Sequence, residues 1–251
     1  MFNVAFLSDT GLKREHNEDS ILINKESGTF IVADGMGGHE KGEVASKILV
    51  ETFLAVPSSN FHANLGDEDD TVVPSSNIED ELNHCVTLAS DKMIAYAKEK
   101  NIESVIGTTV VGVKYVPNIQ AWAMFHLGDS RAYLFNANSL LQLTTDHSRH
   151  EAMRLKNIDE EEIMKTGKNV ITKAIGNFKP YTLDIQYIAT KPGNILLLCS
   201  DGVSDLCTND ELLRLIIQYK HNLDLLCTQV KNLVYTRGAK DNLSIIAIEI
   251  N

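Results

Sequence analysis

The chain has 251 residues, 43% of them hydrophobic and 23% charged, which is ordinary for a globular protein with a sizeable core. Its 23 basic and 34 acidic residues give a formal net charge of −11, which argues against nucleic acid and anionic membranes as partners. Asp9 interrupts the first apolar stretch, and no later apolar run approaches the ~18 residues of a membrane span, so we expect a cytoplasmic protein without a secretory signal.

Secondary structure can be predicted along most of the chain. Runs of apolar and β-branched residues predict strands at residues 4–7, 20–23, 29–33, 108–116, 121–127, 131–135, 183–189, 195–199 and 243–250. Apolar residues at helical spacing predict helices at 40–56, at 77–100, after Thr208 and at 222–235. Ser76 with Glu79, and Thr208 with Glu211, have the spacing of capping boxes.

The order of these elements predicts the fold class. Most strands follow one another directly, and the helices come in pairs, which is not the alternation of a parallel sheet. We therefore expect an α+β fold, a four-layer α-β-β-α sandwich with two mainly antiparallel sheets and helices on the outer faces. We expect residues 1–251 to form a single domain. Residues 57–77, with two Pro-Ser-Ser triplets and an acidic run at 67–70, predict a mobile loop, and that run lacks the ligand spacing of an EF-hand.

The stretch VADGMGGHEKGE, residues 32–43, brings Asp34 from a strand into a run of glycines. A P-loop would need a lysine where Glu43 stands, and a dinucleotide fingerprint would need a glycine where Glu40 stands. A carboxylate at a strand end suits a hard cation, and glycines allow positive φ and close approach of main-chain carbonyls to the same ion. This stretch alone is equally compatible with a metal site and with a tight turn before a helix.

Carboxylates recur at the ends of other predicted strands, namely at Glu18, Asp19, Asp129, Asp201 and Asp241. In a sandwich such ends can converge on one edge, where the charges would repel one another unless divalent cations joined them. Oxygen ligands favour Mg²⁺ or Mn²⁺ over zinc, because no Cys or His pair is placed to compete.

Arg14 is the basic exception, in the segment SDTGLKREHNEDS. A guanidinium beside metal-binding carboxylates is suited to grip a phosphate in bidentate fashion. An ion pair with Glu18 or Asp19 is an equally good interpretation from the residues alone.

Eight segments in order carry a family resemblance: SDTGLKREHNEDS (8–20), VADGMGGHEKGEVAS (32–46), GTTVVGVKY (107–115), HLGDSRAYLF (126–135), LTTDHS (143–148), VITKAIG (170–176), CSDGVSDL (199–206) and RGAKDNLSIIAIEI (237–250). Together they span nearly the whole chain and resemble the bacterial PPM (PP2C-type) family of metal-dependent Ser/Thr protein phosphatases. The resemblance implies the same sandwich, with a dinuclear Mn²⁺/Mg²⁺ site at one edge.

The resemblance also implies a ligand set for these ions. Asp34 would bridge two ions, the carbonyl of Gly35 would serve one of them, and Asp201 and Asp241 would serve the other. Asp129, with Asp201, would hold a third ion.

The resemblance implies hydrolysis of phosphoserine and phosphothreonine in proteins by a water that bridges two ions, with no phosphoenzyme. Arg14 would bind the phosphate, and Glu18 and Asp19 would act mainly through metal-bound waters or by orienting Arg14. Some eukaryotic relatives have His directly after the Asp-Gly pair, where this chain has Met36. The leaving-group proton could then come from His39 or from a metal-bound water, and His39 could instead be a hydrogen-bonded turn residue.

Residues 146–169 match the family's flap beside the site, although Lys165-Thr166-Gly167 stand where many bacterial members have His-Pro. The expected partners are phosphorylated proteins and a cognate Ser/Thr kinase, and the expected state is a monomer.

Three other functions are compatible with parts of the sequence. A phosphatase of an anti-anti-sigma switch would usually carry a sensor domain, and we identify none in residues 1–251. A pseudo-phosphatase that binds phosphoproteins without turnover fits poorly with intact Asp34, Asp201 and Asp241. A simple cation-binding module does not explain Arg14 or the ordered segments.

Overall fold

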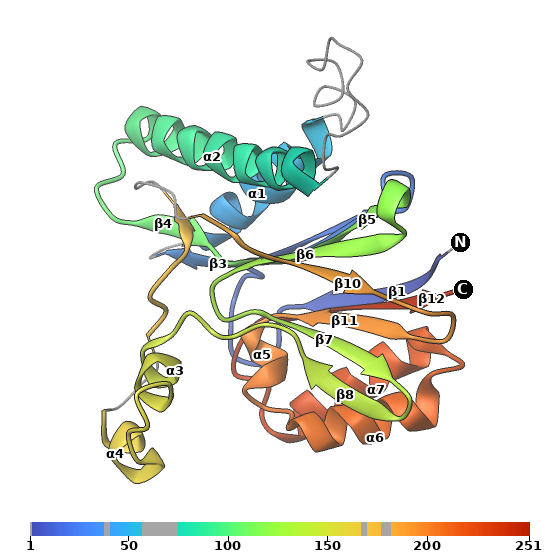
Figure 1. Ribbon diagram of the computed structural model, residues 1–251. Coiled ribbons are helices and arrows are strands. Elements are labelled where there is room, and N and C mark those ends of the chain that lie inside the picture. Colours follow the sequence, from blue (N-terminus) through green and yellow to red (C-terminus); the bar gives the residue numbers. More distant parts are fainter. Residues whose placement is uncertain (1, 38–40, 57–74, 167–169, 177–181) are drawn as a thin grey trace, which may run out of the picture.

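The structure is a computed structural model that describes residues 2–37, 41–56, 75–166, 170–176 and 182–251, and of 75–77 only the backbone. Two β-sheets pack face to face, and a pair of helices covers the outer face of each (Figure 1). The helices of one outer layer are α1 (Gly42–Ala55) and α2 (Ser75–Glu99), and those of the other are α6 (Asn209–Tyr219) and α7 (Leu223–Thr236). The predicted α+β four-layer sandwich is confirmed.

Every strand pair among the described residues is antiparallel. The smaller sheet contains, in spatial order, β1 (Phe2–Asp9), β12 (Leu243–Ile250), β11 (Ile195–Cys199), β7 (Arg131–Asn136) and β8 (Ser139–Gln142). The larger contains β10 (Asp184–Ala189), β6 (Ala121–Leu127), β5 (Val110–Val116), β3 (Thr29–Gly37), β4 (Ile106–Thr108) and β9 (Ile175–Gly176), with β2 (Asp19–Asn24) paired to β3.

The central strands are buried on both faces, which explains why they read as continuous apolar runs. In β12, Ile246 and Ile248 pack between the sheets, whereas Ile245 and Ala247 pack against α6 and α7. The same alternation in β3 sends Phe30 inward and Ile31 toward α1 and α2. Three apolar clusters thus separate the four layers.

Most predicted elements are found within a few residues of their expected bounds, and the Thr208–Glu211 capping box is present. The single strand predicted at 108–116 is wrong. It breaks at Thr109, whose N–H donates to the carbonyl of Asp34 (2.8 Å), so that β4 and β5 are separate. The helix predicted from residue 77 begins at Ser75, so Ser76 lies inside its first turn, and residues 75–77 are not loop.

Several short elements were not predicted, namely α3 (Arg149–Arg154), α4 (Glu160–Lys165), α5 (Asp201–Ser204), the 3₁₀ turn η2 (Pro117–Ile119), β8 and β9. Each is too short to show a hydrophobic period. Helices α3 and α4 project beside one end of the sandwich (Figure 1) and fall within the predicted flap, 146–169.

Some predictions fall on residues that the structure does not describe. These are His39, Gly167 and residues 57–74 of the predicted loop. Among the described residues, no helix combines the length and the apolar character needed to cross a bilayer.

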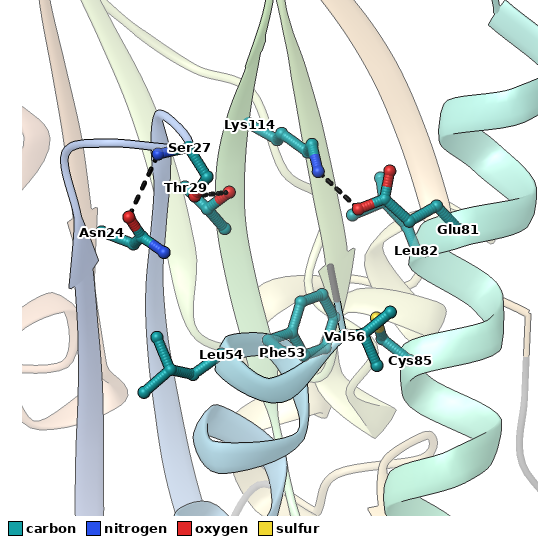
Figure 2. A pocket seen from close by; sticks show the side chains of 10 residues that line it. All are labelled: Asn24, Ser27, Thr29, Phe53, Leu54, Val56, Glu81, Leu82, Cys85 and Lys114. Atoms are coloured by element: carbon teal, nitrogen blue, oxygen red, sulfur yellow. Dashed lines mark hydrogen bonds and ion pairs between the residues drawn. The ribbon is translucent and has the colours of Figure 1, made fainter. Parts of the chain in front are cut away.

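A buried ion pair ties the larger sheet to α2. Nζ of Lys114 lies 2.5 Å from Oε1 of Glu81, and both side chains are less than a tenth exposed (8% and 6%). They line a cavity of about 110 Å³ together with Phe53 and Cys85 (Figure 2). Charges removed from water are costly unless each finds an opposite charge, so each member stabilises the buried state of the other.

Removing one member of this pair should destabilise the fold. Glu81→Ala takes away the carboxylate that balances Lys114, and we expect a loss of about 3–5 kcal/mol in the free energy of unfolding. Urea denaturation at pH 7 measures this change in the free energy of unfolding. The matched control is Glu81→Leu combined with Lys114→Met, which removes both charges and should recover most of the loss. A single variant as stable as the wild type would contradict this account of the pair.

Candidate metal and phosphate site

One cleft, with a volume of about 510 Å³, collects most of the predicted site residues. Its acidic lining residues are Glu18, Asp34, Asp129, Asp146, Asp201, Asp205 and Asp241. Among the described residues that line it, Arg14 is the one basic side chain. Gly35, Met36, Gly37, Val170, Ile171 and Asn242 complete the lining. The carboxylates come from separate chain segments, as the strand-end argument predicts.

Two predicted site residues are not in this lining. His39 lies outside the described residues. Asp19 lies behind the cleft, only 7% exposed, and its Oδ2 accepts a hydrogen bond from the hydroxyl of Ser200 (2.8 Å). It stands directly opposite Asp34 in the β2–β3 ladder. Asp19 therefore adds negative charge behind the cleft without facing it.

The backbone of Asp34 is held by hydrogen bonds to two consecutive threonines, Thr108 and Thr109. Its N–H donates to Oγ1 of Thr109 (3.1 Å), and its carbonyl accepts from the N–H of Thr109 and from the hydroxyl of Thr108 (2.8 and 2.9 Å). The same Oγ1 lies 2.7 Å from the hydroxyl of Ser130, beside Asp129. Sequence analysis missed Thr109, which connects the Asp34 segment to the turn that carries Asp129.

The glycines around Asp34 are required by close packing rather than by positive φ. A Cβ on Gly35 would lie 2.1 Å from the carbonyl oxygen of Gly42 and 2.5 Å from that of Glu18. None of the described glycines in residues 32–43 has a positive φ. The N–H of Gly35 donates to the carbonyl of Glu18 (3.1 Å), so β3 and the segment before β2 touch backbone to backbone. The close packing at Gly35 is therefore between backbone segments, and the approach of its carbonyl to an ion stays a prediction.

Asn242 fixes the loop that carries Arg14 and was also missed. Its Oδ1 accepts from the N–H of Glu18 (2.8 Å), and its Nδ2 donates to the carbonyls of Thr10 and His16 (3.0 and 2.9 Å). An asparagine next to Asp241 at the start of an apolar strand was the available signal. Its side chain makes the hydrogen bonds to the loop backbone that a neighbouring strand would otherwise make.

Arg14 makes an ion pair, but not with either predicted partner. Its Nη2 donates to Oδ2 of Asp241 (2.7 Å), and the two side chains are 45% and 37% exposed. The alternative of a pair with Glu18 or Asp19 is therefore wrong. An ion pair this exposed contributes at most about 1 kcal/mol, so the guanidinium can exchange partners at little cost.

The cleft carboxylates disfavour one another's ionisation. Burial, and then the charges of Asp201 and Asp241, raise the pKa of Asp19 to about 7 despite hydrogen bonds from serines. Burial and the charges of Asp201, Asp146 and Asp205 raise the pKa of Asp129 to about 7 as well.

The same effects act on Asp34. Burial, then the charges of Asp19, Asp201 and Asp129, raise its pKa well above the usual range. Buried oxygens Oδ1 of Asp19 and Asp129 have no hydrogen-bond partner among the described residues. The cleft therefore has more carboxylate oxygens than it has N–H or O–H donors and basic side chains to pair with them. Hard divalent cations bind such oxygens, so the donor set fits Mg²⁺ or Mn²⁺.

Two further acids line the cleft that sequence analysis did not single out. Asp146 accepts two hydrogen bonds from the guanidinium of Arg131 (2.8 and 2.7 Å), so its charge is already balanced. Asp205 follows α5, one turn after Asp201. Val170 and Ile171, at the return of the α3–α4 segment, bring that segment to the rim of the cleft.

Known proteins resemble this chain over its whole length. A family model described as protein phosphatase 2C matches residues 13–231. A serine/threonine phosphatase stp from Listeria welshimeri is 30% identical over 254 residues, which cover 99% of this chain and 96% of that protein. Among solved structures, the serine/threonine phosphatase of S. agalactiae (25% identity, TM-score 0.81) covers both chains completely. The Mycobacterium tuberculosis phosphatase PstP/Ppp (24% identity, TM-score 0.84) covers 100% of this chain and 99% of that one.

Without metal, the acidic site should make stability depend on pH. A carboxyl whose folded pKa is raised from 3.8 to about 7 binds more protons in the folded state, so its contribution to stability falls as pH rises between these values. Asp19→Asn should therefore become more stable than the wild type as pH rises from 5 to 7 in EDTA, by up to about 1.4 kcal/mol per pH unit.

Urea unfolding of both proteins at each pH measures this difference. The comparison with the variant cancels the contribution of His126, whose pKa burial lowers to about 4 and which acts in the opposite direction. Saturating Mn²⁺ should reverse the order of the two proteins. A constant difference between pH 5 and 7 would show that Asp19 is ionised throughout.

Proposed function

Because this chain belongs to the protein phosphatase 2C family and is therefore a serine/threonine protein phosphatase, we propose that its acidic cleft hydrolyses phosphoserine and phosphothreonine in proteins with the help of bound Mn²⁺ or Mg²⁺. The observation that carries the proposal is the convergence of six aspartates and Glu18 on one cleft beside Arg14. The substrates are phosphorylated proteins, and a cognate Ser/Thr kinase supplies them. We expect the enzyme to act as a monomer.

The proposed division of ligands assigns a role to each of these residues. Asp34, held by Thr109, would be a ligand of two ions. The carbonyl of Gly35 would serve one of these ions, and Asp201 and Asp241 would serve the other. Asp129, whose Oδ1 has no hydrogen-bond partner among the described residues, would hold a third ion with Asp201. When bound, such ions supply Lewis acidity, which makes a water nucleophilic at neutral pH and neutralises charge on the phosphoryl oxygens.

Arg14 holds the substrate phosphate in this proposal. A guanidinium has five N–H donors, and the hydrogen bond to Asp241 uses one of its nitrogens, so others can bind a phosphate. Glu18 fixes the position of the Arg14 loop, since its Oε1 accepts from the N–H of Gly42 (3.2 Å). Asp19 acts from behind the cleft through its charge. Because Asp34, Asp201 and Asp241 are all present in the cleft, we favour turnover over a phosphoprotein-binding role without catalysis.

Hydrolysis of p-nitrophenyl phosphate and of a phosphothreonine peptide should require Mn²⁺ or Mg²⁺ and should stop in excess EDTA. Mn²⁺ should also raise the melting temperature, since it binds only where the carboxylates are gathered, and this rise should shrink in Asp34→Asn. Full turnover in EDTA, with metal loss verified by elemental analysis, would contradict the proposal. Peptide binding with no turnover at saturating Mn²⁺ would instead favour the pseudo-phosphatase.

Variants of Arg14 and Asp201 should separate phosphate binding from metal binding. Arg14→Ala should mainly raise KM, since a charge-assisted hydrogen bond to phosphate is worth about 1.5–3 kcal/mol. Asp201→Asn should lower kcat and bound metal together. Lys13→Ala, which removes an equal charge from the adjacent exposed position, should change neither. Steady-state kinetics at saturating Mn²⁺ decide, and equal kcat losses with unchanged KM in Arg14→Ala and Asp201→Asn would refute the division of roles.

A further inference from the structure

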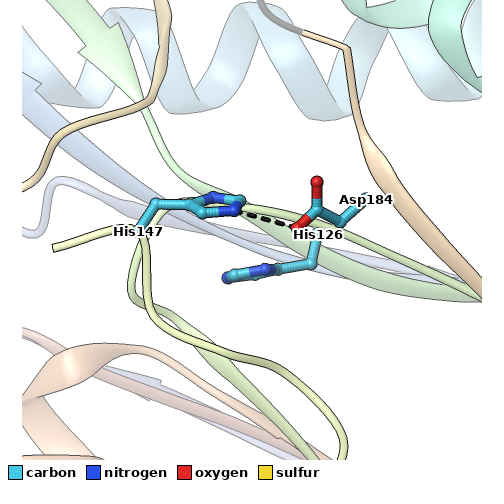
Figure 3. Close-up of side chains that lie close together, drawn as sticks. All are labelled: His126, His147 and Asp184. Carbon is cyan, nitrogen blue, oxygen red and sulfur yellow. Dashed lines mark hydrogen bonds and ion pairs between the residues drawn. The ribbon is translucent and has the colours of Figure 1, made fainter. Parts of the chain in front are cut away.

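Beside the cleft, three segments bring together His126 from β6, His147 from the segment after β8, and Asp184 from β10 (Figure 3). The two imidazole rings are stacked, with centroids 4.8 Å apart and planes 22° apart. Both histidines are buried, at 1% and 9% exposure. Sequence patterns carry no signal for this pair, and neither histidine lines the acidic cleft. The cluster needs an explanation that the proposed phosphatase site does not supply.

A second metal site is the first interpretation to test, because one ligand atom from each residue lies within 4.8 Å of the others. The hydrogen bonds argue against it. Nδ1 of His147 already accepts from the N–H of Gly128 (3.1 Å), so the neutral ring carries its proton on Nε2, 3.0 Å from Oδ2 of Asp184. Nζ of Lys173 lies 3.3 Å from the same Nε2 and would repel a cation. Because the two rings are stacked, the lone pairs of their nitrogens lie in nearly parallel planes, which is a poor arrangement for pointing at one shared ion.

His147 instead holds the turn that carries Asp129. It exchanges two hydrogen bonds with Gly128, because its own N–H donates to the Gly128 carbonyl (2.7 Å) while Nδ1 accepts from the Gly128 N–H. Gly128 has φ +124°, and a Cβ there would lie 2.6 Å from the side chain of Thr109. The carbonyl of His147 accepts from the N–H of Thr172 (2.8 Å), which ties the same residue to the return of the α3–α4 segment.

We propose that His147 is a positioning residue that fixes the Gly128–Asp129 turn so that the Asp129 carboxylate meets the third metal ion. The inference rests on the proposed role of Asp129 and deepens it. The carboxylate depends on its backbone for position, since Oδ1 has no hydrogen-bond partner among the described residues. Residues one step behind the ligands of a metal typically change its affinity by about 10–100-fold.

Two substitutions test the roles of the two ring nitrogens of His147 separately. His147→Asn places an amide oxygen near the position of Nδ1 and can keep the bond to Gly128. His147→Gln reaches the position of Nε2 and Asp184 but has no acceptor near Nδ1. In calorimetric titration of the metal-free protein with Mn²⁺, we expect the weakest site to lose about 10–100-fold in affinity in His147→Gln and to stay near wild type in His147→Asn. Melting temperatures in EDTA verify that both variants fold.

Asp129→Ala, titrated in parallel, separates failure of the premise from failure of the inference. If Asp129→Ala leaves the weakest site unchanged, the proposed role of Asp129 is wrong and the inference falls with it. If Asp129→Ala abolishes that site while His147→Gln binds like the wild type, only the inference is overturned. His126→Phe keeps a stacked ring without nitrogens, and a loss as large as that of His147→Gln would assign an ion to the imidazole cluster itself.

Amide hydrogen exchange in the wild type provides a test that needs no variant. Because coupling between the ion and the turn is reciprocal, filling the weakest Mn²⁺ site should slow exchange at Gly128 and His147. Equal exchange at these two amides with and without that ion would overturn the proposal.

Discussion

Mutual repulsion among carboxylates is the constraint around which this molecule is organised. Asp34 and Asp19 come from adjacent strands of the larger sheet, Asp201 and Asp241 come from the ends of strands in the smaller sheet, and Asp129 lies on the turn between β6 and β7, where the chain passes from one sheet to the other. Folding must bring these charges together before any cation can compensate them. The apolar layers between and outside the sheets supply the free energy that allows this.

The supports of the cleft consist largely of backbone and short polar side chains. Thr109 and Ser130 link Asp34 to the Asp129 turn, and Asn242 links Asp241 to the loop of Arg14. Gly35 and Gly202 leave no room for a Cβ, since one at Gly202 would lie 1.9 Å from the carbonyl of Asn242. Because these supporting groups are short and hydrogen-bonded, the carboxylates have little freedom to move apart. Their repulsion is then relieved by binding cations, which raises the affinity of the cleft for cations.

Sequence reasoning reached the layers and five of the seven acids that line the cleft, because both depend on patterns that are local. Continuous apolar runs mark strands buried on two faces, and aspartates mark their ends. It could not reach Thr109, whose role depends on a residue 75 positions away, or Asn242, whose partners are more than 200 positions away. Helices α3 and α4 could not be predicted because six residues hold no full hydrophobic period. The stacked histidines could not be predicted because the segment of His147 meets the end of β6 only in the folded chain, through the hydrogen bond of His147 to Gly128.

The pairing of β1 with β12 has a consequence for synthesis of the chain. Phe2 lies opposite Ile250 and Asp9 opposite Leu243, so β1 has no strand partner in the described sheet until β12 has been synthesised (Figure 1). Asp241 emerges directly before β12. A nascent chain therefore has neither the β1–β12 pair nor the full set of these carboxylates until the segment from Asp241 through β12 has been made. Loss of β12 would also remove the strand that joins β1 to β11, so a single cut before this strand would disrupt both the smaller sheet and the position of Asp241.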